Sequence, residues 1–389
     1  MLEIKSNNHL LERDSFTESE IFGQPDLWLK LWKDFQSTSY ELKKYLDSVL
    51  NSKDIRIILT GAGTSAFIGD VLLGIFNKSF PNPISAVATT DLITHPELYF
   101  NKSNKYLLIS FARSGNSPES SQIILLAEEL SKQVYHIIIT CNKESELTKT
   151  ISTKNHFTFL MPPEADDKGL AMTGSFTTML LAGLLISRIN YDDGLDEQFN
   201  ILYKYGNKIL NGYLKEIQKA ASLDFKRAVF LGSGMLKGIA RESHLKLQEL
   251  TDGKVICKYD SFMGFRHGPK AVIDEDTLLV YLFSNNQYAS LYELDLVNTI
   301  SSGRKNLFSI GVMEEEINSA NVDLKIVLSE NGIKLQEDFL TVVSVLPAQL
   351  LGFFKSLDLG LKPDYPSDSG MIHRVVQGVN VYPYNNGKE

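Results

Sequence analysis

Short apolar runs alternate with amphipathic stretches along most of the chain. Runs at 55–60, 84–90, 106–112 and 134–141 have the length and the Ile, Val and Leu content of buried strands. Helical spacing of apolar residues marks 65–76 and 119–132 between them. Strand, helix and strand in repeated order predict a parallel sheet covered by helices on both faces. The first half of the chain is therefore predicted to be an α/β domain.

Apolar residues also recur at helical spacing before this domain, between Pro25 and Leu50. The polar interval 36–39 interrupts them, so we expect two helices joined at that point. These helices are predicted to be scaffold and to carry no chemistry.

The second half of the chain repeats the order of the first. Apolar runs at 228–231, 254–259, 277–284 and 306–312 alternate with helical stretches, and a second Gly-x-Gly turn opens a helix over 236–250. Phe176 follows Gly61 by 115 positions, and Pro347 follows Gly232 by 115 positions, each inside an apolar helix. Equal spacing over a domain length predicts two related α/β domains that arose by internal duplication. We expect N-terminal helices in 1–50, domains in 51–195 and 223–361, a linker helix in 196–222, and a tail in 362–389 that packs near the site.

The composition narrows the classes of protein. The 389 residues carry a net charge of −8, which argues against a nucleic-acid partner because such binding needs clustered Lys and Arg. Cys141 and Cys257 lie in apolar runs and are predicted to be buried thiols rather than a disulfide. Residues 1–14 show no targeting pattern, and no later segment approaches the ~20 apolar residues of a membrane span. We therefore expect a cytoplasmic protein with no membrane contact.

A glycine-rich turn after the first strand is the first candidate site. Gly63, Thr64 and Ser65 lead from that strand into a helix, whose N-terminus offers free N–H groups to an anion. A dinucleotide site is disfavoured because the third glycine of that fingerprint is missing. A tight turn without any ligand is the alternative at this point.

A serine-rich loop after the next long strand is the second candidate. Arg113, Ser114 and Ser117 stand between a strand and a helix, where hydroxyls and backbone amides form a phosphate cradle. Simple capping of the helix that includes Glu119 is the alternative. Two such turns at neighbouring strand ends favour a ligand in the crevice beyond the sheet.

Five segments in this order, GAGTS, SFARSGNSPES, LAMTGSFT, ESHLKLQELT and FRHGPK, resemble the double SIS-domain sugar isomerases. The resemblance is closest to the AgaS-type galactosamine-6-phosphate deaminase/isomerases and runs over nearly the whole chain. It implies two flavodoxin-like SIS domains, each a three-layer α/β/α unit. It also implies conversion of galactosamine 6-phosphate to tagatose 6-phosphate with release of ammonia, without a metal or cofactor.

The resemblance also assigns roles to residues. In the related isomerase domain of glucosamine-6-phosphate synthase, the loop matching 113–117 holds the sugar phosphate and the turn matching Thr64 and Ser65 contacts the substrate. The glutamate that moves the proton between C1 and C2 matches Glu249. The histidine that opens the ring matches His267 and comes from the neighbouring subunit, which implies a homodimer. The tail lysine of that enzyme has no clear counterpart, so no role is assigned to Lys388.

The residue types agree with these roles. Glu242, Lys246 and Glu249 share one helix face, where Lys246 is a candidate substrate ligand beside the base; a solvated charged face is the alternative. His267 stands in a Gly-Pro turn and can act as an acid or a base near neutral pH. Thr173 offers a hydroxyl to the sugar, although helix capping explains it almost as well.

Two other functions stay open. A fructosamine-type deglycase shares the fold and the glutamate but releases an amine from a sugar. A sugar-phosphate sensor binds the same ligand without turnover, but it is expected to lack the carboxylate of Glu249 and to carry a DNA-binding region. Configuration at C4 of the sugar, galacto or gluco, is not readable from the sequence.

Overall fold

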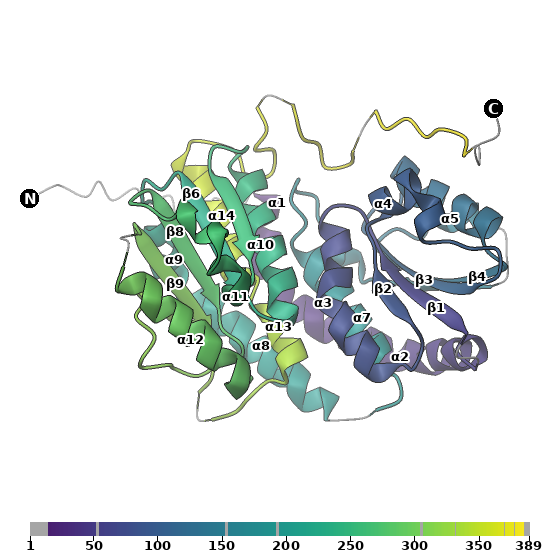
Figure 1. Cartoon of the computed structure of the whole chain (residues 1–389), viewed down its shortest axis with the longest axis horizontal. Coiled ribbons are helices and arrows are strands. Elements are labelled where there is room, and N and C mark those ends of the chain that lie inside the picture. Colours follow the sequence, from purple (N-terminus) through teal and green to yellow (C-terminus); the bar gives the residue numbers. More distant parts are fainter. Residues whose placement is uncertain are drawn as a thin grey trace, which may run out of the picture.

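Two parallel five-stranded sheets lie side by side in the computed structural model of the chain, with helices between and around them (Figure 1). The structure describes residues 15–51, 54–151, 155–191, 194–303, 306–330, 332–368, 370–376 and 378–384. Residues 1–14 and Lys388, which the sequence analysis mentions, lie outside these ranges.

The chain enters through two helices, α1 (Phe16–Phe22) and α2 (Gln24–Val49). The predicted break at 36–39 is wrong, since α2 is one continuous helix of 26 residues. Its apolar stripe keeps its register through the polar interval, from Phe35 to Leu42 and Leu46. The hydroxyls of Ser37 and Thr38 donate to the carbonyl of Asp34, so they are satisfied inside the helix.

The first sheet has the strand order β2-β1-β3-β4-β5, all parallel. This is the flavodoxin-like order. Strand β2 lies on one side of β1 and strand β3 on the other, so the order of strands reverses between β1 and β3. The elements are β1 (Ile55–Thr60), α3 (Thr64–Ser79), β2 (Ile84–Ala86), α4 (Thr89–Thr94), η1 (Pro96–Leu98), β3 (Lys105–Ala112), α5 (Pro118–Leu130), β4 (Gln133–Thr140), α6 (Glu146–Thr150), β5 (His156–Leu160), η2 (Pro163–Ala165) and α7 (Gly174–Ser187). The predicted strand at 84–90 is shorter than expected, because its second half turns into α4.

The second sheet repeats this order as β7-β6-β8-β9-β10, which confirms the predicted duplication of the fold. Two helices lead to it, α8 (Leu195–Gly212) and α9 (Leu214–Ala221). The elements that follow are β6 (Arg227–Gly232), α10 (Met235–Leu250), β7 (Ile256–Asp260), α11 (Phe262–Phe265), η3 (Gly268–Val272), β8 (Thr277–Leu282), α12 (Gln287–Ser301), β9 (Phe308–Met313), β10 (Leu324–Val327), α13 (Glu337–Val343) and α14 (Leu346–Asp358).

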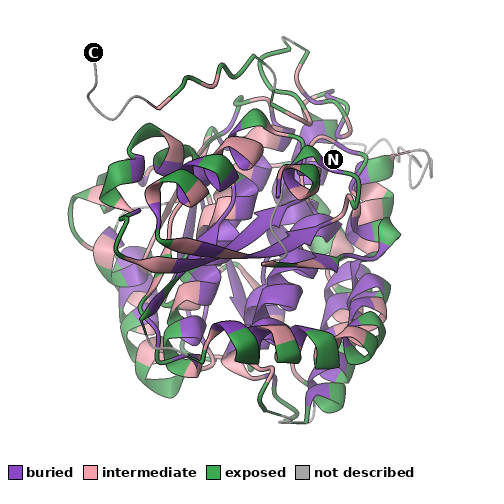
Figure 2. Ribbon diagram, turned by 90° about the vertical axis from the view of Figure 1, so that its right-hand side faces the viewer, coloured by how far each residue is buried: buried purple, intermediate pink, exposed green. Residues whose placement is uncertain are grey.

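The two sheets share one hydrophobic core, in which α3 and α10 pack on each other between them (Figure 1). Gly238 of α10 allows this approach, because a Cβ at that position would lie 2.6 Å from Cγ2 of Val71 on α3. Every residue of α7 is buried, as expected for a helix that is apolar on all sides. Figure 2 shows the buried strands enclosed by helices whose outer faces are exposed.

The helical stretch Glu337–Asp358 is long and apolar enough to cross a membrane, although 89% of its most apolar window is buried in the protein. The same stretch forms α13 and α14 of the shared core. Cys141 and Cys257 are free, as predicted, but each is half-buried rather than fully buried. After α14 the described part of the tail has no helix or strand and crosses from the second sheet to α4 and α5 of the first (Figure 1).

Candidate active site

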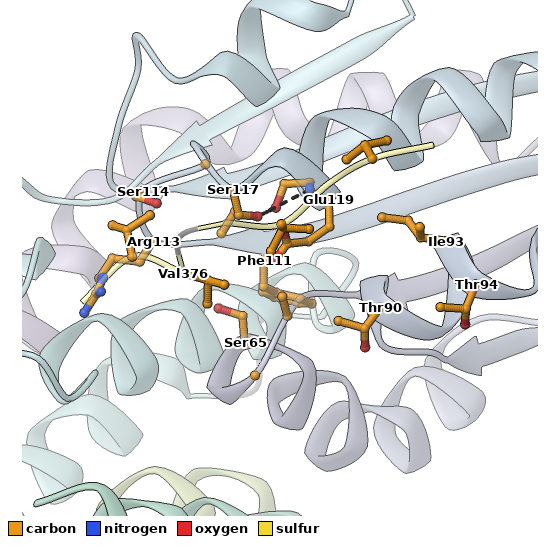
Figure 3. Close-up of a pocket in the computed structure, with 18 of the residues that line it drawn as sticks. Ser65, Thr90, Ile93, Thr94, Phe111, Arg113, Ser114, Ser117, Glu119 and Val376 are labelled. Atoms are coloured by element: carbon orange, nitrogen blue, oxygen red, sulfur yellow. Dashed lines mark hydrogen bonds between the residues drawn. The ribbon is translucent and has the colours of Figure 1, made fainter. Parts of the chain in front are cut away.

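A cavity of about 720 Å³ lies beyond the carboxyl ends of β1 and β3. Ligands of open parallel sheets bind at this position, where the strand order reverses. Five predicted binding residues line the cavity: Gly63, Ser65, Arg113, Ser114 and Ser117. The structure thus brings the two candidate turns together into one site (Figure 3).

The first turn is built around Gly63, which has a φ of +56° and directly precedes α3. This left-handed conformation favours glycine, and it exposes backbone of the turn to the cavity. The amides of Ser65 and Ala66 are bonded back to Ala62 and Gly63. Thr64 points away from the lining and is buried.

The serine loop is held rigidly by its neighbours. Gly115 has a φ of +60°, and a Cβ there would lie 2.7 Å from Cβ of Ser145. The side chain of Asn116 accepts a hydrogen bond from the backbone N–H of Glu146 at 3.0 Å. Ser117 caps α5, because its hydroxyl accepts from the N–H of Ser120 at 3.3 Å while it also faces the cavity. Capping and ligand binding are therefore compatible at this serine.

Arg113 connects the loop to the tail. It is 6% exposed, and its Nη2 donates to the carbonyl of Arg374 at 2.6 Å. Arg374 in turn binds Asp166 at 2.7 Å and the carbonyl of Asp167 at 2.8 Å. Burial lowers the pKa of Arg113, yet a guanidinium stays charged at any physiological pH. Its Nη1 is buried without a hydrogen-bond partner among the described residues, so one arm of this cation is available for a ligand.

Thr173 occupies a different place from the one predicted. It is fully buried, it is absent from the cavity lining, and its hydroxyl donates to Asp167 at 3.0 Å. The same carboxylate accepts from the N–H groups of Thr173, Gly174 and Ser175 and so caps α7. Met172 reaches the cavity in its place.

A buried charged cluster connects α10 to the first turn. Lys246 is fully buried, and its Nζ lies 2.8 Å from Oε2 of Glu249, 3.2 Å from Oε1 of Glu242 and 3.2 Å from the hydroxyl of Thr64. Glu249 keeps 24% of its side chain exposed, whereas Glu242 is fully buried. The solvated charged face considered above is therefore wrong for Glu242 and Lys246.

Burial raises the pKa of Glu242 to about 8, against the lowering effect of Lys246. Burial alone lowers the pKa of Lys246, but the two carboxylates outweigh it and raise that pKa above its usual value. Lys246 is paired with Glu249, and burial favours the neutral form of Glu242 beside it. Oε2 of Glu242 has no hydrogen-bond partner among the described residues.

His267 is exposed and lies outside the cavity lining, at the start of η3. Within one chain the structure does not bring it to the predicted site. Among the described residues, no three His, Cys, Asp or Glu side chains gather closely enough to hold a metal ion.

The matching crevice of the second domain is occupied by carboxylates of the chain itself. Glu293 is fully buried and accepts from the N–H of Ser284 at 2.9 Å, while its Oε1 has no hydrogen-bond partner among the described residues. The hydroxyl of Ser284 donates to Glu337. The amide and the hydroxyl of Ser284 are therefore already used at this crevice.

Several lining residues were not predicted from the sequence. Thr90, Ile93 and Thr94 come from α4, and Glu119 comes from the first turn of α5. The tail contributes 374–376 and 379–384. An extended tail without periodicity gives no signal of what it covers, and the sequence analysis considered Glu119 only as part of a helix that the serine loop caps.

Known proteins resemble this chain over its whole length. The SIS domain family model matches residues 49–187. The chain is 37% identical to the D-galactosamine-6-phosphate deaminase AgaS of Shewanella sp. (strain ANA-3), over 98% of this chain and 97% of that protein. It is 39% identical to the protein of the same name from Escherichia coli, over 95% and 96%.

Two solved structures share the architecture. The crystal structure of tagatose-6-phosphate ketose/aldose isomerase from Escherichia coli has a TM-score of 0.86 at 35% identity, over 96% of this chain and 97% of that one. A structure from Clostridium novyi NT has a TM-score of 0.92 at 40% identity, over 96% of each chain.

Proposed function

The chain belongs to the AgaS family of SIS-domain proteins, and from this premise we propose that it converts galactosamine 6-phosphate into tagatose 6-phosphate and ammonia. The names of its relatives and the serine and arginine side chains that line the cavity support an amino-sugar phosphate as the substrate.

The observation that carries the proposal is the contact between Lys246 and Thr64 at 3.2 Å. Lys246, which is bonded to Thr64 of the first turn, also binds Glu249 at 2.8 Å, although neither Lys246 nor Glu249 is among the described residues that line the cavity. A base for proton transfer between carbons needs to be close to the substrate and shielded from bulk water. Glu249, with 24% of its side chain exposed, meets the second condition while staying accessible.

The proposed reaction starts from the open-chain aldehyde form of the substrate. Glu249 removes the proton from C2, and the carbonyl oxygen at C1 takes a proton. The product of this step is an enolamine. Glu249 returns a proton to C1, and the C2 imine forms. Water adds to C2 and the C–N bond breaks. Ammonia leaves, and C2 becomes the ketone of the product. The phosphate stays on Ser114, Ser117 and Arg113 throughout.

Ring opening requires an acid or base, and no histidine is among the described residues that line the cavity, so we assign this step to His267 of a second copy. Its exposure supports this assignment. The active unit would then be a homodimer, and its compartment the cytoplasm, as the sequence analysis expects.

The direct test incubates the purified protein with galactosamine 6-phosphate and glucosamine 6-phosphate and measures ammonia and ketose phosphate. We expect ammonia and tagatose 6-phosphate from the galacto compound. Glu249→Gln should lower kcat by about 10²- to 10⁴-fold while KM changes little, because the amide keeps the shape but transfers no proton. Glu216→Gln, an exposed carboxylate on α9, is the control. Near-normal turnover by Glu249→Gln would remove this residue as the base.

Subunit mixing tests the role of His267. The variants Glu249→Gln and His267→Asn are each expected to be inactive. Unfolding and refolding them together in equal amounts should restore about one quarter of the wild-type activity, if the histidine acts across a two-fold interface. No restoration would place the histidine in its own chain's site or outside catalysis.

A further inference from the structure

The cavity presents one unpaired cation and one unpaired anion. Arg113 and Glu119 both line it, and each is only 6% exposed. Nη1 of Arg113 and Oε2 of Glu119 are buried and have no hydrogen-bond partner among the described residues. No ion pair joins the two side chains within that part of the protein, and Figure 3 shows them on opposite sides of Ser117.

Buried charged groups are normally paired, because an unpaired charge loses its hydration without compensation. Glu119 lines the cavity, so a positively charged or hydrogen-bond-donating ligand there would supply the partner that its buried oxygen lacks. The cation and the anion of this cavity together complement a ligand that carries both an anion and a cation.

Glu249 does not need a cationic ligand, because the ammonium of Lys246 already lies 2.8 Å from its carboxylate. Glu119 has no ion-pair partner among the described residues, and it lies in the first turn of α5, two positions after Ser117, which also lines the cavity. The N-terminus of a helix is a favourable position for a negative charge.

We propose that Glu119 binds the ammonium group of the substrate and is the residue that selects an amino-sugar phosphate over the corresponding neutral sugar phosphate. The inference rests on the proposed function and adds the residue that determines this choice. The phosphate end lies on Arg113, Ser114 and Ser117, and the ammonium end lies against Glu119. Glu119 thus acts as a specificity residue, while proton transfer stays with Glu249.

The test uses two unreactive probes, 2-amino-2-deoxygalactitol 6-phosphate and galactitol 6-phosphate. Neither is turned over, since C1 carries no carbonyl, and they differ only in an amine or a hydroxyl at C2. We expect wild-type protein to bind the amino probe about 10- to 100-fold more tightly in calorimetry, as for a charge-assisted hydrogen bond. In Glu119→Gln the two dissociation constants should come within about 3-fold of each other, with binding of the neutral probe retained.

Three further variants make the test specific. Glu119→Asp keeps the charge and should preserve the preference in part. Arg113→Gln should raise the dissociation constants of both probes by the same factor, because it removes a phosphate contact. Glu129→Gln, an exposed carboxylate on the same helix, should change neither.

A wild-type protein with equal affinity for the two probes would overturn the inference, as would an unchanged preference in Glu119→Gln. These outcomes are separate from failure of the proposed function. If wild-type protein releases no ammonia from any amino-sugar phosphate, the function is wrong even where the probe preference holds. If ammonia is released and Glu119→Gln keeps the preference, only this inference is wrong.

Discussion

The ammonium of Lys246 donates to the hydroxyl of Thr64 at 3.2 Å, so a helix of one sheet is bonded to the first turn of a helix of the other. The same ammonium neutralises Glu249 at 2.8 Å. One side chain therefore joins the two domains and positions the proposed base.

Replacing Lys246 should weaken the contact between the two domains and disturb the position of Glu249. Lys246→Met leaves the Glu249 carboxylate without its cation, and breaking a buried ion pair typically costs about 3–5 kcal/mol of unfolding free energy. Thr64→Val removes the hydrogen bonds of the hydroxyl to Lys246 and Glu242 and should cost about 1 kcal/mol for each. Urea unfolding of both single variants and the double variant measures their coupling, which we expect to be about 0.5–3 kcal/mol. Strictly additive effects would show that the contact contributes nothing to stability.

Glu242 should make stability depend on pH. Its pKa is about 8 in the folded protein and 4.5 when exposed, so the folded state holds the extra proton between these values. Its contribution is therefore complete below about pH 4.5 and is lost as the pH rises through about 8. Glu242→Gln cannot ionise and should lose less stability than the wild type between pH 5.5 and 8.5, by about 3 kcal/mol or less. Urea unfolding at the two pH values checks this.

The opposite pH dependence of the stability of Glu242→Gln would have a clear meaning. If Glu242 were an ionised partner of Lys246, the glutamine variant would be most destabilised at the higher pH. That result would contradict the assignment of a neutral carboxyl group.

Arg374 should control how the tail covers the cavity. It binds Asp166 and the carbonyl of Asp167, and its own carbonyl accepts from Arg113. Arg374→Gln should raise KM about 10-fold, as expected for loss of charge-assisted hydrogen bonds, and should speed proteolysis within 370–384. Lys362→Gln, an exposed cation at the base of the tail, is the matched control. Unchanged KM and proteolysis in Arg374→Gln would mean that the tail is held by other contacts.

The second domain should bind no second substrate molecule. Glu293 already accepts from the amide of Ser284, and Glu337 accepts from its hydroxyl. Calorimetry with galactitol 6-phosphate should therefore give one binding site per chain. Glu293→Gln should leave binding at the cavity of the first domain unchanged. Two equal sites per chain in the wild-type protein would contradict this interpretation.

Local signals were enough to predict most of the fold. The runs that became β1, β3 and β4 are continuous and apolar, and the equal spacing from Gly61 and Gly232 predicted two related sheets. The break expected in α2 failed because polar residues that bond inside a helix do not end it. The domain limits, the dimer and the residue roles stay predictions.

The sequence by itself determined the order of strands and helices along the chain, the duplication and the two turns that line the cavity, because periodicity and glycine conformation act over a few residues. Only the tertiary structure decided that Lys246 is buried against Thr64, that Thr173 is bonded to Asp167, and that the tail lines the cavity. The contacts of Lys246 and of the tail join positions far apart in the chain. Their energies depend on the burial of polar groups, which is decided by the packing of distant segments and not by the local pattern of residues.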